Sequence, residues 1–150
     1  MSTKNFLILI IIIGICILII NTFLLQICIV RGKSMEPTLH DKNLIIIEKY
    51  KMKIKREDIA VIKKDKKIII KRVVGIPGDK LQIKEGYLYV NEQKYDDYYM
   101  EYAGLLQEEV CLNKDEYFVI GDNRNYSIDS RFNEIGFIKK NEIIGKVLFK

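Results

Sequence analysis

The sequence has few of the residue types that bind metals or form disulfide bonds. It contains a single histidine, His40, and only three cysteines. Cys16 and Cys28 lie in a long apolar segment, so Cys111 stands alone in the rest of the chain. These few residues exclude a convincing zinc site and an internal disulfide outside the apolar segment.

Charged residues are absent between Phe6 and Val30, where isoleucine and leucine dominate. As a helix, this stretch would extend roughly 37 Å, enough to span the ~30 Å hydrocarbon core of a bilayer. Polar residues in its second half place the expected spanning core at Phe6 to about Leu25. A cleaved signal peptide would have a shorter apolar stretch and a small-residue exit, which is missing here. We therefore expect residues 1–30 to form an N-terminal tail and a retained transmembrane anchor.

The net charge of +5 comes from lysines that are interspersed with acidic residues rather than gathered in one arm. Because no recognised motif accompanies them, nucleic-acid binding is disfavoured. A mild attraction to anionic lipid headgroups fits a basic surface beside an anchor. The flanking charges do not decide the orientation, because Lys4 is nearly balanced by Arg31 and Lys33 on the other side.

Residues 31–150 are enough for one domain with its own core, and their pattern is that of short strands. Strand-length apolar or β-branched runs occur at 44–47, 59–62, 68–74, 117–120 and 143–149. Leu81 to Val90 predicts a hairpin around a Glu-Gly turn. Tyr95 to Leu106 is polar and tyrosine-rich, which favours a surface excursion over a substrate-facing loop. The pattern indicates a mainly β protein, an all-β barrel or sandwich-like domain following a transmembrane helix.

Ser34 lies four residues past the apolar segment and is a candidate nucleophile. A serine before a proline is usually only a turn residue. Here Pro37 stiffens the turn and Gly32 allows close backbone approach, which favours a functional role. A serine hydroxyl needs a base, and His40 with Asp41 would require one short loop to fold sharply back on itself.

Lys71 is the better candidate base. A solvated lysine has a pKa near ~10.4 and is a poor base at neutral pH, but burial lowers the pKa of an amine. Strand alternation would point Lys71 and Arg72 to opposite faces. The pattern alone leaves open whether Lys71 faces inward as a base or outward as an ordinary strand lysine.

A polar loop from Gly121 to Arg131 follows the strand at 117–120. Its hydroxyl and carboxylate groups could hold a lysine amine in place. We expect structural ion pairs there, either between Asp129 and Arg131 or between Asp122 and Arg124.

Four blocks, in this order, resemble the type I signal peptidases, which are serine proteases with a Ser–Lys dyad. The blocks are GKSMEPTL at 32–39, EDIAV at 57–61, KRVVGIPGD at 71–79 and GDNRNYSIDSR at 121–131. The closing Ile-Gly-Lys at 144–146 also fits. Gly32 takes the place of a serine found in some members of the family, as in the Gram-positive branch.

The resemblance implies roles for five residues. Ser34 would be the nucleophile and Lys71 the neutral general base, with Ser127 bonded to the lysine amine. Asp129 would pair with Arg131 and shape the site. The backbone N–H of Ser34 would form part of the oxyanion hole, and the second donor stays unassigned.

The resemblance also implies the substrates and the location. Shallow apolar pockets would accept small residues one and three positions before the cut, and the positions matching their lining are Val30, Met35, Leu39 and Ile70. No metal or organic cofactor would be needed. The partners would be signal peptides of exported preproteins, membrane lipid and the secretion machinery. The protein would cross the plasma membrane once, with its catalytic domain on the extracytoplasmic face.

Three other interpretations fit parts of the sequence. A self-cleaving, repressor-like Ser–Lys enzyme is disfavoured by the anchor and by the absence of a DNA-binding segment. A membrane-tethered β module that binds exported proteins without activity is disfavoured by intact Ser34, Lys71, Ser127 and Asp129. A dedicated processing protease for a few exported substrates stays open, because little is inserted between Val90 and Tyr117.

Overall fold

The computed structural model describes residues 3–19, 24–49, 53–101 and 104–149, and its fold is mainly β. Strands form a seven-stranded sheet and a four-stranded sheet, and every neighbouring pair is antiparallel. The larger sheet has the order β1 (Leu25–Ile29), β2 (Leu44–Glu48), β11 (Ile143–Phe149), β3 (Ile59–Lys64), β4 (Lys67–Gly75), β9 (Glu116–Ile120) and β10 (Ile138–Lys139). The smaller sheet has the order β7 (Gln93–Lys94), β6 (Tyr87–Val90), β5 (Lys80–Lys84) and β8 (Val110–Cys111).

All five strand runs expected from the sequence are strands, and the expected hairpin is formed by β5 and β6. Side-chain burial alternates from one residue to the next, as in a β-strand with one buried face: in β2, Ile45 and Ile47 are buried while Leu44 is exposed. β4 is the longest strand and is rich in β-branched residues, as its sequence predicted.

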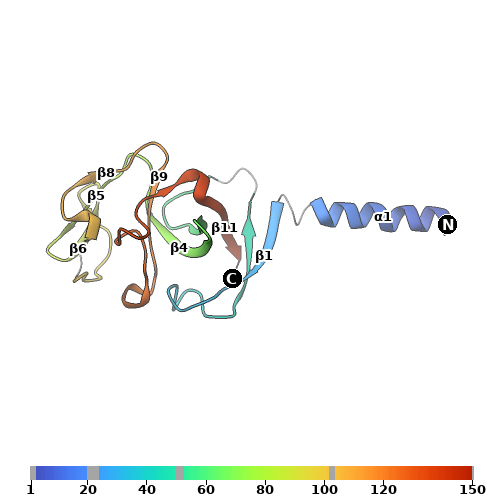
Figure 1. The fold of residues 1–150 in the computed structure, drawn as a ribbon, viewed down its shortest axis with the longest axis horizontal. Coiled ribbons are helices and arrows are strands. Elements are labelled where there is room, and N and C mark those ends of the chain that lie inside the picture. Colours follow the sequence, from blue (N-terminus) through green and yellow to red (C-terminus); the bar gives the residue numbers. More distant parts are fainter. Residues whose placement is uncertain (1–2, 20–23, 50–52, 102–103, 150) are drawn as a thin grey trace.

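The helix α1 (Thr3–Ile19) stands to one side of the strands in Figure 1. In the described residues, no helix has both the length and the apolar character needed to cross a bilayer. Residues 20–23, which the expected spanning core includes, lie outside the described residues.

The end of the apolar segment is a strand of the larger sheet. Leu25 to Ile29 form β1, in which Leu25 pairs with Glu48 and Ile29 with Leu44. These residues therefore add a strand to the larger sheet, and the division of the chain at residue 30 stays a prediction. An apolar run alone does not distinguish helix from strand, and here pairing with β2 decides for strand.

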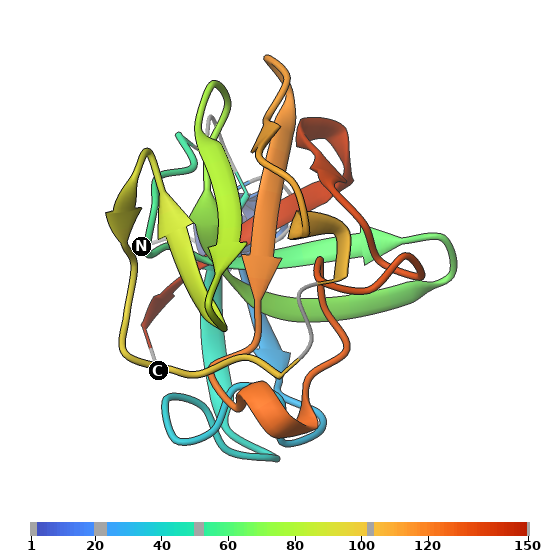
Figure 2. The same cartoon turned by 90° about the vertical axis from the view of Figure 1, so that its left-hand side faces the viewer.

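Three buried clusters fill the β domain. One lies between the smaller sheet and β9 and includes Leu81, Leu88 and Phe118. A second contains residues of β3, β4, β9, β10 and β11. The third packs the loop after β1 against β2 and β3 through Val30, Met35, Leu39, Ile45, Ile47 and Val61. Figure 2, viewed from the side of the smaller sheet, shows its strands in front of the larger one.

Candidate active site

Ser34 and Lys71 meet although 37 positions separate them in the chain. Nζ of Lys71 lies 2.7 Å from Oγ of Ser34, which is hydrogen-bonding distance. Lys71 is only 4% exposed, whereas its neighbour Arg72 turns the other way, as strand alternation requires. The question that the sequence left open is thus answered: Lys71 faces inward.

The loop after β1 is rigid enough to hold Ser34 in this place. Met35 and Leu39 are buried in the third cluster, and the Leu39 N–H donates to the Met35 carbonyl at 2.8 Å. Gly32 has φ +91°, a conformation that residues other than glycine rarely adopt. Its N–H donates to the Asp41 carboxylate. His40, by contrast, is exposed, and its imidazole lies 3.9 Å from the carboxylate of Glu36.

Burial is the main reason that the pKa of Lys71 lies below its ordinary value. The carboxylates of Asp129 and Asp122 act in the opposite direction because they stabilise the charged amine. The positive charge of Arg131 adds to the lowering. An amine in this setting is neutral at a lower pH than a solvated lysine, which is the property that a general base requires.

Ser127 is buried beside the Ser34 loop, but it does not make the predicted bond to Lys71 in this structure. Its hydroxyl has no hydrogen-bond partner among the described residues. Gly121 makes room for it: a Cβ at this position would lie 2.2 Å from Oγ of Ser127 and 2.5 Å from the carbonyl oxygen of Ser34. The glycine thus allows three chain segments to meet at the site.

The predicted pair between Asp129 and Arg131 is formed in the interior. The arginine Nε and Nη2 donate to the two carboxylate oxygens at 2.8 and 3.0 Å. Asp129 also accepts from the Gly121 N–H at 3.0 Å, and Arg131 donates to the carbonyl of Arg124 at 2.9 Å. This pair therefore holds both ends of the loop from 121 to 131 together.

The alternative pair between Asp122 and Arg124 is wrong. Asp122 accepts two hydrogen bonds from Arg72, at 2.7 and 2.6 Å. These bonds lower the pKa of Asp122 although its burial acts to raise it. The next residue, Asn123, donates its N–H to the carbonyl of Ser34 at 3.0 Å. The Arg72–Asp122 pair thus holds the loop after β9 next to Ser34.

A cleft of about 680 Å³ opens over Ser34 and Lys71. Its walls come from residues 27–32 on one side and from residues 66 and 68–71 on the other. Three of the four residues expected to bind substrate line it: Val30, Met35 and Ile70. Leu39 does not, because it is fully buried in the third cluster below the loop.

The sequence interpretation missed several residues of the site. Ile27, Cys28 and Ile29 line the cleft but were assigned to the anchor, because their apolar run continues it without a break. The partner of Arg72 was also missed. Alternation indicates that Arg72 faces away from Lys71, but no local sequence pattern identifies Asp122, 50 positions away, as its partner.

The comparisons with known proteins identify the family. The family model described as signal peptidase, peptidase S26, matches residues 3–150. Signal peptidase I of Bacillus amyloliquefaciens is 37% identical over 145 residues, which cover 87% of this chain and 78% of that protein. Signal peptidase I of Bacillus caldolyticus is 40% identical over 141 residues, covering 81% and 76%.

A crystal structure of a signal peptidase I from Enterococcus faecalis V583 is 25% identical, with a TM-score of 0.47, and the match covers 65% of this chain and 97% of that one. The family match includes every residue discussed at the cleft, and the Bacillus relatives share more than a third of their aligned positions with this chain. The chain therefore belongs to the signal peptidase family, peptidase S26, and is a serine endopeptidase.

Proposed function

We propose that this enzyme removes signal peptides from exported preproteins, with Ser34 as the nucleophile and Lys71 as the general base. The observation that carries the proposal is the 2.7 Å contact between a buried amine and a serine hydroxyl at the base of an apolar cleft. The names of the Bacillus relatives, signal peptidase I, support the substrate class.

The reaction begins when the neutral Lys71 amine accepts the proton of Ser34 as Oγ attacks the scissile carbonyl. The oxyanion that forms is stabilised by the Ser34 backbone N–H, and one such donor is worth roughly 3–4 kcal/mol. The Lys71 ammonium then returns its proton to the leaving amine, which gives the acyl-enzyme. Water, deprotonated by Lys71, releases the signal peptide and restores the serine.

The loop from 121 to 131 supports the base in this proposal. Ser127 holds the Lys71 amine once the substrate has excluded water, because its buried hydroxyl is free to turn toward it. The Asp129–Arg131 pair keeps two opposite charges at fixed places near the Lys71 amine. The carboxylate stabilises the protonated amine that forms during the reaction, whereas the arginine favours its deprotonation.

The walls of the cleft are suited to an extended peptide. Among the described residues, β1 pairs only with β2, and the first half of β4 pairs only with β3. Their free backbone edges can therefore bind a substrate strand between them. Val30, Met35 and Ile70 leave shallow space beneath such a strand, which favours small side chains next to the cut.

We further infer that the N-terminal segment anchors the enzyme in the plasma membrane as a single pass, with the β domain on the extracytoplasmic face. The inference is supported by the large apolar side chains that α1 exposes and by the lack of charge from Phe6 to Val30. The division into 1–30 and 31–150 stays a prediction, with residues 25–29 contributing β1 to the sheet. An anchor raises the local concentration of enzyme where membrane-bound preproteins emerge.

The test is cleavage of a panel of preproteins by the purified full chain in detergent, with product masses measured by mass spectrometry. The proposal expects one cut per substrate, after a small residue, and no product with Ser34→Ala. Binding without any cleavage by the wild-type chain would contradict it. Cleavage of only a few panel members would identify a dedicated processing enzyme.

A further inference from the structure

We propose that the segment from Tyr95 to Tyr98, called here the tyrosine segment, positions the catalytic loop from Gly121 to Arg131. Asp96 is its main positioning residue and acts through Arg124. The proposal rests on the proposed function, because it concerns how the base Lys71 is prepared for catalysis. Figure 2 shows the tyrosine segment, in dark yellow, crossing the lower part of the view near the orange turn of the catalytic loop.

The contact between the two segments centres on one buried cation. The Asp96 carboxylate accepts a hydrogen bond from Nη2 of Arg124 at 2.6 Å. The Arg124 side chain is 8% exposed, and among the described residues this is its one ion pair. Its Nε and Nη1 are buried without a hydrogen-bond partner there, and the guanidinium lies 5.2 Å from the centre of the Tyr98 ring. Asp96 is thus the carboxylate bonded directly to the buried cation, and Asp122 interacts with it electrostatically without an ion pair.

Two further bonds make the contact specific. The Tyr98 hydroxyl donates to the side-chain carbonyl of Asn125, the residue after Arg124. The Tyr98 N–H donates to Asp96 at 3.2 Å, which turns the carboxylate toward the catalytic loop. The tyrosine segment therefore holds two consecutive loop residues by charge and by hydrogen bonds.

Arg124 transmits this placement to the residues around Lys71. It begins a short 3-10 turn, Arg124–Tyr126, and Ser127 follows directly. Its carbonyl also accepts the hydrogen bond from Arg131, which pairs with Asp129. A displaced Arg124 would therefore move both Ser127 and the Asp129–Arg131 pair, whose charges act on the Lys71 amine.

The tyrosine segment is also linked to Asp122 of the loop, through Glu57 and Arg72. The Tyr95 hydroxyl donates to the Glu57 carboxylate, and Glu57 lies 3.7 Å from Arg72, which binds Asp122. Burial and the bond to Glu57 raise the pKa of Tyr95, so its hydroxyl stays protonated as a donor. The tyrosine segment is thus linked to the catalytic loop at Arg124 and Asn125 directly and at Asp122 through Glu57 and Arg72.

Removing the Asp96 carboxylate would leave the Arg124 cation buried and unpaired, which is strongly unfavourable. The guanidinium would turn toward water and shift the loop. Lys71 is faced by Asp129, Arg131 and Asp122 from this loop and by Ser34 from the loop after β1. A looser loop admits water to the amine and raises its pKa, so less of the base is neutral at neutral pH.

The experiment measures the pH dependence of kcat/KM for preprotein cleavage by wild type, Asp96→Ala, Asp96→Glu and Asp97→Ala. Asp97 is the matched control, since its side chain is 98% exposed and pairs with Lys94 at the surface. We expect Asp96→Ala to lose between about tenfold and 100-fold at neutral pH, as small misplacements do. The loss should shrink at alkaline pH, because the acid limb of the profile moves to higher pH. Asp96→Glu should restore part of the lost activity.

Two results would overturn the proposal: equal profiles for Asp96→Ala and Asp97→Ala, or a loss of the same factor at every pH, as a merely structural role predicts. If Asp96→Ala does not fold, Tyr98→Phe decides, because it removes only a hydroxyl. The proposal expects a smaller shift of the acid limb in the same direction, and no shift would overturn it. Absence of cleavage by the wild-type chain would instead contradict the proposed function.

Discussion

At the scale of single residues, the environment of Lys71 rather than its type suits it to the proposed role of general base. It extends inward from β4, with Ser34 at its amine and the Asp129–Arg131 pair nearby. Desolvation lowers its pKa, and the two carboxylates that oppose this effect are each paired with an arginine. Pairing with an arginine weakens the attraction of each carboxylate for the protonated amine, so burial has the larger effect on the pKa of Lys71.

The first prediction concerns pH. Because Lys71 must be neutral to accept a proton, kcat/KM should fall as the pH decreases through the pKa of its amine. Since burial lowers that pKa, the acid limb should lie below the ordinary lysine range. The measurement is initial cleavage rate against pH at low substrate concentration. A profile that rises toward acid pH would contradict a neutral lysine base.

The second prediction concerns Gly121. An alanine here would place its Cβ 2.2 Å from the Ser127 hydroxyl and 2.5 Å from the Ser34 carbonyl oxygen, so both segments must shift. Overpacking of this kind costs about 1–3 kcal/mol of stability. The effect on kcat/KM should be larger, about 100-fold, because the dyad loses its alignment.

Gly14→Ala serves as the control, since a Cβ there meets nothing within 4 Å. Thermal unfolding and cleavage kinetics of both variants separate the two effects. Near wild-type kinetics for Gly121→Ala would show that the close approach at this glycine is not needed.

At the scale of elements, the apolar run from Phe6 to Val30 contains both a helix and a strand, which have different roles. α1 ends at Ile19, whereas Leu25 to Ile29 pair with β2 and form one wall of the cleft. The exposed side chains of Ile27 and Ile29 alternate with Gln26 and the half-buried Cys28, as a sheet edge allows.

The third prediction follows from this division. A chain beginning at Leu24 keeps β1 and should fold, with cleavage of a soluble peptide within about tenfold of the full chain. A chain beginning at Arg31 lacks β1 and Val30, and the buried valine side chain alone contributes about 1.5–3 kcal/mol. We expect the shorter chain to fold poorly and to be inactive.

Circular dichroism on heating and peptide cleavage compare the two truncations. If both fold and cleave equally well, β1 is dispensable and the described wall of the cleft does not bind substrate. If neither folds, the segment before Leu24 is needed for the domain itself.

The sequence predicts the long strands well because their β-branched runs and turn residues act locally, as in β4 and the hairpin of β5 and β6. It misses β7, β8 and β10, which have two residues each and too little pattern to recognise. It predicts Ser34 and Lys71 through motif resemblance. The partner of Arg72 and that of Arg124 depend on tertiary contacts between distant segments, which no local pattern encodes.

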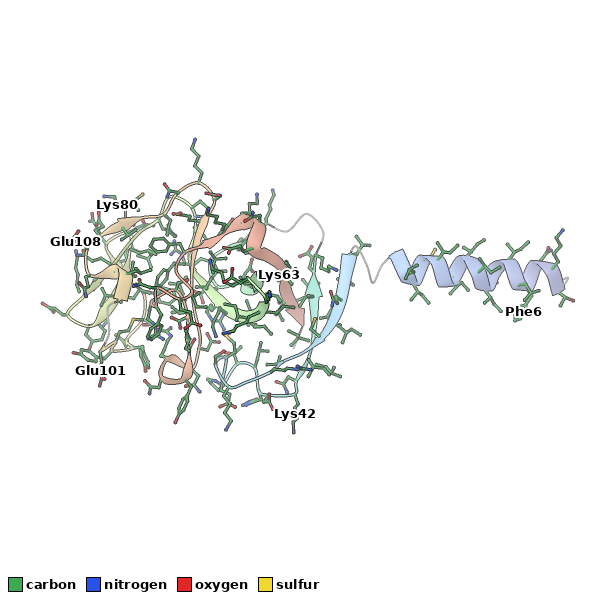
Figure 3. All side chains as sticks on the ribbon, in the orientation of Figure 1. Phe6, Lys42, Lys63, Lys80, Glu101 and Glu108 are labelled. Carbon is green, nitrogen blue, oxygen red and sulfur yellow. The ribbon has the colours of Figure 1, made fainter. Side chains whose placement is uncertain are left out.

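At the scale of the whole molecule, the helix and the smaller sheet lie at opposite ends. Figure 3 shows Phe6 at the far end of α1 and Lys80, Glu101 and Glu108 at the other end of the protein. The cleft includes residues of β1, the strand that follows α1 in the chain. If α1 anchors the chain as proposed, a membrane-bound substrate would reach the cleft from the helix side.

The fourth prediction tests the proposed anchor. The full chain should float with lipid vesicles in a density gradient, whereas the chain beginning at Leu24 should stay mostly in the soluble fraction. The physical reason is that α1 exposes large apolar side chains along its length, and their transfer into lipid is favourable. Equal flotation of both chains would show that the β domain alone binds the membrane.

The most direct test of the whole account is the rate of preprotein cleavage by purified Lys71→Met, compared with wild type and with Lys67→Met. Methionine keeps most of the length of the side chain but removes the amine, and Lys67 is an apt control because its side chain is 79% exposed on the same strand. We predict that kcat/KM falls by ~1,000-fold or more for Lys71→Met and stays near wild type for Lys67→Met. Cleavage by a folded Lys71→Met chain within about tenfold of wild type would contradict the assignment of the base.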